Sequence, residues 1–246
     1  MSGGNSLRRL ALDLAVDRKT VIRKFEFLGL HSTHFSDEAN KTYPKAEEMQ
    51  FDDMETFEHS KCKPLSITLA VVGKQRRILG FEVSQMPAKG MLAKISRKKY
   101  GRRSDERPEG RRRLFTKVKD LISDNCIIKS DMNPHYTKDV ERHFPGHVHK
   151  AFKGRRGCVV GQGELKRGGF DPLFTLNHNC AMLRENLNRL RRKTWSTTKK
   201  PERLRLHLAI FTLYYNEFYL KKRKCLHNAA FNQFLSRQSN TSLITR

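Results

Sequence analysis

Residues 49–57, Met49-Gln50-Phe51-Asp52-Asp53-Met54-Glu55-Thr56-Phe57, hold the strongest indication of the fold of this chain. It has the length and composition of a strand, and two further strand-like stretches follow at 65–72 and 76–83. Gly73-Lys74-Gln75 makes a tight hairpin between those two, so residues 49–83 predict an antiparallel meander. Alternation along a strand puts Phe51 and Asp52 on opposite faces. One of Asp52 and Asp53 must therefore point toward a covered face of the sheet.

The sequence after the meander alternates between helical and strand patterns. Helices are predicted at 114–123 and 137–144, strands at 126–130 and 147–152, and two closing helices at 181–194 and 203–221. Strand, helix and strand after a three-strand meander predict an α/β fold, a mixed sheet with helices on its faces.

The first thirty residues predict two helices around a tight turn. Ser6 is the expected N-cap of the first helix and Asp17 that of the second, with Ala15 in the turn where glycine is usual. This is the layout of a helix-turn-helix, and an ordinary helical hairpin with a solvated basic face is the alternative. The second helix would carry toward a major groove the residues Arg18, Lys19, Thr20, Arg23 and Lys24. Residues 31–48 are polar and predict an irregular linker.

The charge of the chain indicates a polyanionic partner. Its 246 residues include 50 Lys and Arg against 25 Asp and Glu, a net charge of +25, which favours binding to DNA or RNA. No stretch approaches the about 20 apolar residues of a spanning helix, so no membrane partner is expected. The N-terminus has no apolar signal core, and the five cysteines form no CxxC pair. We therefore expect a cytoplasmic protein without a disulfide framework or structural zinc.

A very basic segment at 86–113 interrupts the predicted sheet. It includes Arg97, Lys98 and Lys99 and is punctuated by proline and glycine. We expect a flexible loop that becomes ordered on a phosphate backbone, and the alternative is a loop that only increases solubility.

Two aspartates are the candidate catalytic residues. Asp52 lies in the first strand, and Asp131 follows the strand 126–130 at its carboxyl end, where ligands collect in open α/β sheets. If these strands are neighbours, the two carboxylates meet, as phosphoryl transfer with two metal ions requires. A single aspartate in either position can equally be a turn or cap residue.

Three motifs, in this order, resemble those of bacterial insertion-sequence transposases of the insertion-sequence-one type and their relatives. They are residues 51–57 with the Ser60-Lys61 that follows, then Ser130-Asp131, and then Arg189-Leu190-Arg191-Arg192-Lys193-Thr194. The resemblance covers about residues 50–220, with the helix-turn-helix in the expected place. It implies an RNase H-like catalytic domain at 49–222, an N-terminal DNA-binding module at 1–30 and a C-terminal tail at 223–246.

The resemblance also implies an active site and a reaction. Asp52 and Asp131 correspond to the first two acids, and the third, a glutamate in the family, falls on Asn177, with Glu185 as the rival. Two Mg²⁺ or Mn²⁺ ions would be held there. The enzyme would cut double-stranded DNA at the element's terminal inverted repeats and join the freed 3′ hydroxyl to target DNA, as a homo-oligomer associated with the bacterial nucleoid. The DNA backbone would be held by Arg184, Arg189, Arg192 and Lys193.

Two other readings stay open on the sequence alone. One is a catalytically inactive, transposase-derived DNA-binding protein or repressor, which the absence of a third carboxylate favours. The other is a basic RNA-binding or ribosome-associated protein, which only the charge favours.

Overall fold

The computed structural model describes residues 5–153, 171–190 and 200–223 and contains a five-stranded sheet. Its strands are β1 (Ala46–Phe57), β2 (Pro64–Val72), β3 (Ile78–Gln85), β4 (Ile122–Asp131) and β5 (Val148–Phe152). They lie in the order β3-β2-β1-β4-β5. The first three strands pair antiparallel, whereas β4 and β5 run parallel to β1. The prediction of a mixed sheet built on an antiparallel meander is confirmed.

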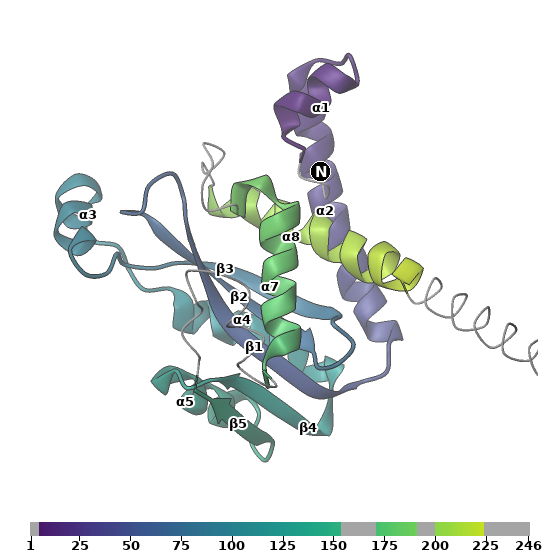
Figure 1. Cartoon of the computed structure of the whole chain (residues 1–246), viewed down its shortest axis with the longest axis vertical. Coiled ribbons are helices and arrows are strands. Elements are labelled where there is room, and N and C mark those ends of the chain that lie inside the picture. The colour runs from purple at the N-terminus through teal and green to yellow at the C-terminus, as the bar shows by residue number, and fades with distance from the viewer. Residues whose placement is uncertain (1–4, 154–170, 191–199, 224–246) are drawn as a thin grey trace, which may run out of the picture.

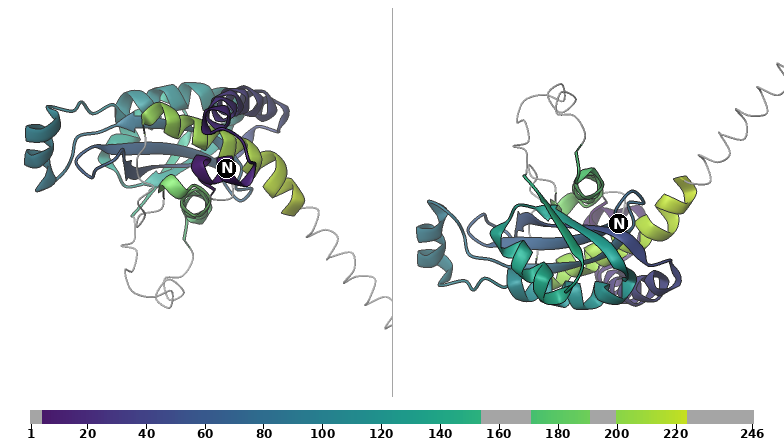
Figure 2. Two further views of the ribbon diagram at one scale, coloured as in Figure 1. Left: turned by 90° about the horizontal axis from the view of Figure 1, so that it is seen from above. Right: turned by 90° about the horizontal axis from the view of Figure 1, so that it is seen from below.

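Helices cover both faces of the sheet (Figures 1 and 2). On one face, apolar side chains of α7 (Phe174–Asn186) and α8 (Pro201–Tyr214) pack on Leu65, Ile67 and Leu69 of the interior strand β2. On the other face, α4 (Arg107–Val118) and α5 (Pro134–His143) pack on Met49 and Phe51 of β1. Burial on two faces explains why β2 is a nearly continuous apolar run instead of an alternating one.

The N-terminal helices are α1 (Leu7–Asp13) and α2 (Arg18–Thr42). The predicted caps are confirmed, because the Ser6 side chain accepts the Arg9 N–H and the Asp17 side chain accepts the Lys19 N–H. Ala15 in the turn has a φ of 50°, the left-handed region that favours glycine.

The irregular linker expected at 31–48 is wrong, since helix α2 continues to Thr42 and strand β1 begins at Ala46. The apolar stripe of α2 docks this helix on α8, where the tilted rings of Phe25 and His207 are in contact and Gly29 leaves room for Leu206. Side-chain packing therefore extends the helix through residues whose polarity suggested a loop. The helix-turn-helix itself stays a prediction.

The flexible loop expected at 86–113 is also wrong. It contains α3 (Leu92–Tyr100) and the first half of α4, which begins with Pro108 in its first turn. Helix α3 projects from the body of the molecule (Figure 1) and is tied to the β1–β2 connection by a hydrogen bond from Ser96 to the Cys62 carbonyl. The sequence showed no helical pattern here, because Ser96 is the one buried residue of α3 and the rest of the helix is largely charged.

The remaining elements agree with the prediction in type and differ in their bounds. Helix α5 begins at Pro134 instead of 137, and α7 begins at Phe174 instead of 181. Short helical turns follow α4, α7 and α8, at Lys119–Leu121, Asn188–Leu190 and Tyr215–Tyr219. The helix predicted at 181–194 ends at Asn186 instead, where Leu187 adopts an extended conformation before the turn at Asn188–Leu190. Residues 191–194 of that prediction and all but the first residue of the 223–246 tail lie outside the described residues.

Candidate active site

Asp52 and Asp131 lie side by side on neighbouring strands. The last paired residues of the parallel strands β1 and β4 are Gln50 and Lys129. Two further residues along each strand are Asp52 and Asp131, and residues two apart share a face. The negative charge of Asp131 is one of the causes that raise the pKa of Asp52, in agreement with this proximity. The sequence motif alone could not establish that β1 and β4 are neighbours.

The pair is electrostatically unfavourable without a cation. Burial and the neighbouring Asp131 raise the pKa of Asp52 to about 6. Burial likewise raises the pKa of Asp131, even though its Oδ1 accepts the Asn133 N–H at 3.0 Å. Within residues 5–153, 171–190 and 200–223, neither carboxylate has a Lys or Arg within ion-pair distance. Two carboxylates that repel each other in a partly buried position are suited to bind a divalent cation.

Asp53, the next residue, has a structural role instead. Its Oδ2 accepts a hydrogen bond from Arg111 at 3.0 Å, and Arg111 also bonds to Asp139 at 2.5 Å. The hydroxyl of Thr68 donates to the other oxygen of Asp53. The Arg111 and Asp53 side chains are 4% and 8% exposed, so this ion pair belongs to the core beneath α4. Strand alternation thus sends Asp53 to the α4 face and leaves Asp52 on the α7 face.

Tyr136 on α5 holds Asp52 in place. Its hydroxyl donates to Asp52 Oδ1 at 3.0 Å and accepts the Asp53 N–H at 3.0 Å. Burial and the surrounding carboxylates raise the pKa of Tyr136, which keeps the hydroxyl protonated as a donor. The ring is 1% exposed and packs on Phe51, so its position is fixed by the core.

Helix α7 runs alongside β1 in a defined register. The Gln50 side chain accepts the Leu176 N–H at 3.1 Å and donates to the Pro172 carbonyl at 3.3 Å. Cys180, one turn later, lies near Asp52. Burial and the negative charge of Asp52 together raise the pKa of the Cys180 thiol to about 12. Four helical residues advance about 6 Å and two strand residues about 6.6 Å, so the helix and strand stay in step. Cys180 is therefore the residue of α7 that lies level with Asp52 of β1.

Asn177 and Arg184 flank Cys180 on the same side of α7. They lie about 60° and 40° around the helix from Cys180, whereas Asn179, about 100° the other way, bonds to the Arg76 carbonyl and Tyr215. Asn179 therefore faces the β2–β3 hairpin, and Asn177 faces the side of the sheet that carries β4. The Asn177 amide donates to Asp171 Oδ2 at 2.8 Å. Within the described residues, its carbonyl oxygen accepts no hydrogen bond and is available as a ligand.

Glu185, the rival third acid, is exposed and lies about 140° around α7 from Cys180. That angle turns it away from the face of the helix that contacts β1. The geometry therefore favours Asn177 over Glu185 as the third residue.

A hollow of about 490 Å³ opens at Asp131. Three segments line it, and they contribute two cationic side chains beside one carboxylate and a mixed polar and apolar turn: Lys89, Arg107, Asp131, Met132, Asn133, Pro134 and His135. Lys89 reaches Glu55 at 2.5 Å, and Arg107 bonds to Asp105. The positive side chains around one carboxylate suit an anionic substrate placed against it.

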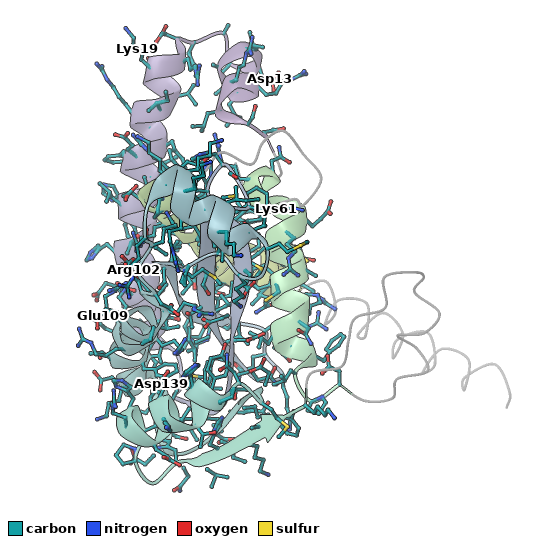
Figure 3. All side chains as sticks on the ribbon, turned by 90° about the vertical axis from the view of Figure 1, so that its left-hand side faces the viewer. Asp13, Lys19, Lys61, Arg102, Glu109 and Asp139 are labelled. Atoms are coloured by element: carbon teal, nitrogen blue, oxygen red, sulfur yellow. The ribbon has the colours of Figure 1, made fainter. Side chains whose placement is uncertain are left out.

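The predicted DNA-contacting residues come from three segments of the chain. The first turns of α2 expose Arg18, Lys19, Thr20, Arg23 and Lys24, and Figure 3 shows Lys19 at the end of α2 farthest from β4 and β5. Helix α3 exposes Arg97, Lys98 and Lys99. Arg184 and Arg189 line one pocket at the end of α7. Burial lowers the pKa of Arg189, and the positive charge of Arg18 nearby lowers it further. Arg192 and Lys193 lie outside the described residues.

The residues around Asp52 fit a divalent metal ion with oxygen ligands. Asp52, Asp131 and the Asn177 carbonyl are hard oxygen donors of the kind Mg²⁺ and Mn²⁺ prefer. Among the residues that the structure describes, no third His, Cys, Asp or Glu joins the pair in a metal-binding group.

Sequence reasoning missed Tyr136, Arg111 and Gln50. A signal for Tyr136 was present, because Asn133 and Pro134 form an N-cap and first-turn pair that places Tyr136 in the first turn of α5. Nothing in the local sequence identified Arg111 or Gln50, whose partners are 58 and 126 residues away.

Within the described residues, none of the helices is both long and apolar enough to cross a membrane. A scan against protein-family models and a search of curated proteins give no match for this chain.

Proposed function

We propose that this protein is a metal-dependent DNA transposase, which cleaves a strand at the end of a mobile element and transfers it to target DNA. The observation that carries the proposal is the pair Asp52 and Asp131 on neighbouring parallel strands, with no ion pair to a Lys or Arg of the described ranges. The strand order β3-β2-β1-β4-β5, with helices on both faces, supports an RNase H-like catalytic domain.

Asp52, Asp131 and the Asn177 carbonyl would hold divalent ions, Mg²⁺ or Mn²⁺, which neutralise charge on the scissile phosphate and its leaving oxygen. The protein's own residues do the rest. Tyr136 orients Asp52, Asp171 orients the Asn177 amide, and the Asp53–Arg111 pair fixes the strand beneath them. Lys89 and Arg107 would attract the phosphate backbone to the hollow at Asp131.

The basic residues of α2 and α3 support a DNA substrate over a small phosphate ester. The exposed side chains of Arg18, Lys19, Arg23 and Lys24 on α2 and of Arg97, Lys98 and Lys99 on α3 offer several positive charges to one extended polyanion. Contacts to the DNA backbone would supply affinity, and the exposed first turns of α2 are the candidates for reading bases at the element ends. A homo-oligomer would bring the two ends of the element together.

The test is strand cleavage on a labelled duplex that carries the inverted repeat flanking the coding region. We expect Mg²⁺- or Mn²⁺-dependent cleavage that Asp52→Asn and Asp131→Asn each reduce to background. Asp124→Asn is the matched control, because Asp124 is an exposed aspartate on β4 itself and should leave cleavage unchanged. Cleavage that survives Asp52→Asn would refute the assigned site.

A DNA-binding protein without catalysis is the second candidate, favoured by the neutral Asn177. It predicts specific binding to the same duplex with no cleavage in any variant or metal. Tighter binding to structured RNA than to the duplex would instead favour an RNA-binding protein.

A further inference from the structure

A second pocket, of about 420 Å³, lies at the end of β1 beyond Asp52. Met54, two residues after Asp52, contributes to its lining, as does Arg184, one turn after Cys180 on α7. Lys89 lines both this pocket and the hollow at Asp131, so the two are adjacent. We call it the Met54–Met86 pocket. Its volume is within the range of about 300–1,000 Å³ typical of ligand sites.

The floor and the rim of the pocket differ in chemistry. Met54, Met86 and Leu190 are 4%, 1% and 4% exposed and form an apolar floor. Lys61 and Lys89 lie on exposed segments and add positive charge at the rim, and Figure 3 shows Lys61 beside the upper end of α7. Glu55 is the one carboxylate of the lining, and it pairs with Lys89 at 2.5 Å.

We propose that the Met54–Met86 pocket binds the base of an unpaired nucleotide whose neighbouring phosphate lies at Asp52 and Asp131. This inference deepens the proposed function and rests on it. A nucleotide joins a flat, largely apolar ring to an anionic phosphate, which matches an apolar floor beneath a cationic rim. Methionine thioethers make favourable contacts with aromatic rings, and both Met54 and Met86 are available to do so.

The strand must be unpaired at this point. Bases of a duplex are stacked inside it, so only an extruded or single-stranded nucleotide can place its ring in a protein pocket. The pocket begins about 7 Å along β1 from Asp52. It would therefore hold a base next to the cleavage position and fix the strand's register there.

Two single strands of equal charge test the inference in the full chain. One is a fluorescent 12-nucleotide oligothymidine, and the other is a 12-unit abasic strand with the same phosphates. Because a stacked base contributes about 1–3 kcal/mol, we expect the abasic strand to bind at least about fivefold more weakly. The measurement is fluorescence anisotropy in EDTA, so that no cleavage takes place.

Variants locate that difference. Ala88→Trp fills the pocket, whereas Ala93→Trp is its control, since Ala93 is a similarly half-buried alanine that does not line the pocket. We expect Ala88→Trp to reduce the fivefold preference to nearly none without weakening the abasic strand, and Ala93→Trp to preserve it. A second pair of variants repeats the test with smaller side-chain changes on α3. Leu92→Ala alters a residue that lines the pocket, and Ile95→Ala is its control, because Ile95 is an exposed apolar residue of the same helix that does not line it.

Equal affinity of the wild-type protein for both strands would overturn the inference. So would loss of the preference in Ala93→Trp and Ile95→Ala as much as in the pocket variants. The outcome is separable from that of the proposed function, because binding in EDTA does not require the carboxylates to hold a metal. If the protein prefers the strand with bases but does not cleave DNA, or cleaves it without metal, the inference about the pocket stands and the proposed transposase function is refuted.

Discussion

Asp52→Asn is expected to stabilise the metal-free protein at alkaline pH. The folded structure raises the pKa of Asp52 from 3.8 to about 6. A raised pKa means that the folded state binds this proton more tightly than the unfolded chain does. Its contribution to stability is therefore complete below pH 4 and is lost as the pH rises to about 6. At about 1.4 kcal/mol for each pKa unit, the loss above pH 6 is up to about 3 kcal/mol.

Asparagine keeps the shape of Asp52 and can still accept the Tyr136 hydroxyl, but it carries no charge. At pH 8 in EDTA, we expect Asp52→Asn to raise the free energy of unfolding by about 1–3 kcal/mol, and at pH 4 the gain should disappear. The assay is urea denaturation followed by far-UV circular dichroism. Mg²⁺ should then stabilise the wild type and close the gap, because only the wild type binds it with both carboxylates.

Asp53→Asn is the control, with the opposite sign. It removes one partner of the buried pair with Arg111 and should destabilise the protein by about 3 kcal/mol at pH 8. The reasoning is refuted if Asp52→Asn is no more stable than the wild type at pH 8, or if its gain is the same at pH 4.

Three further predictions follow from single contacts. Tyr136→Phe removes a donor that favours ionised Asp52, so the acid limb of the pH profile of cleavage should move up by about one unit, and a shift toward lower pH would contradict the assigned hydrogen bond. Ala15→Gly relieves a φ of 50° and should raise the free energy of unfolding by about 1 kcal/mol in urea melts, with Ala11→Gly inside α1 expected to lower it. Gly29→Val would bring side-chain atoms onto Leu206, which already lies 2.7 Å from a Cβ at this position, and calorimetry should show a lower Tm, whereas an unchanged Tm would contradict the packing of α2 on α8.

The sequence by itself determined the elements whose signals are local. Apolar spacing and turn residues located the five strands, and the N-caps Ser6 and Asp17 located the starts of the first two helices. It failed where packing overrides local composition. Helix α2 runs through a polar segment because α8 covers it, and α3 forms in a highly charged one because Ser96 anchors it to Cys62.

The sequence named Asp52, Asp131 and Asn177 as candidates, but only the tertiary structure shows how these residues lie relative to one another. Asp52 and Asp53 are equivalent as neighbours in the sequence, and they differ because Arg111, 58 residues away, neutralises Asp53 and not Asp52. The meeting of Asp52 with Asp131 depends on β1 and β4 being adjacent and parallel. The resemblance already favoured Asn177 over Glu185, and the register that Gln50 sets between β1 and α7 adds a geometric reason for that preference. Such relations join segments far apart in the chain, so no local pattern of residue types can encode them in a form that is readable from one sequence.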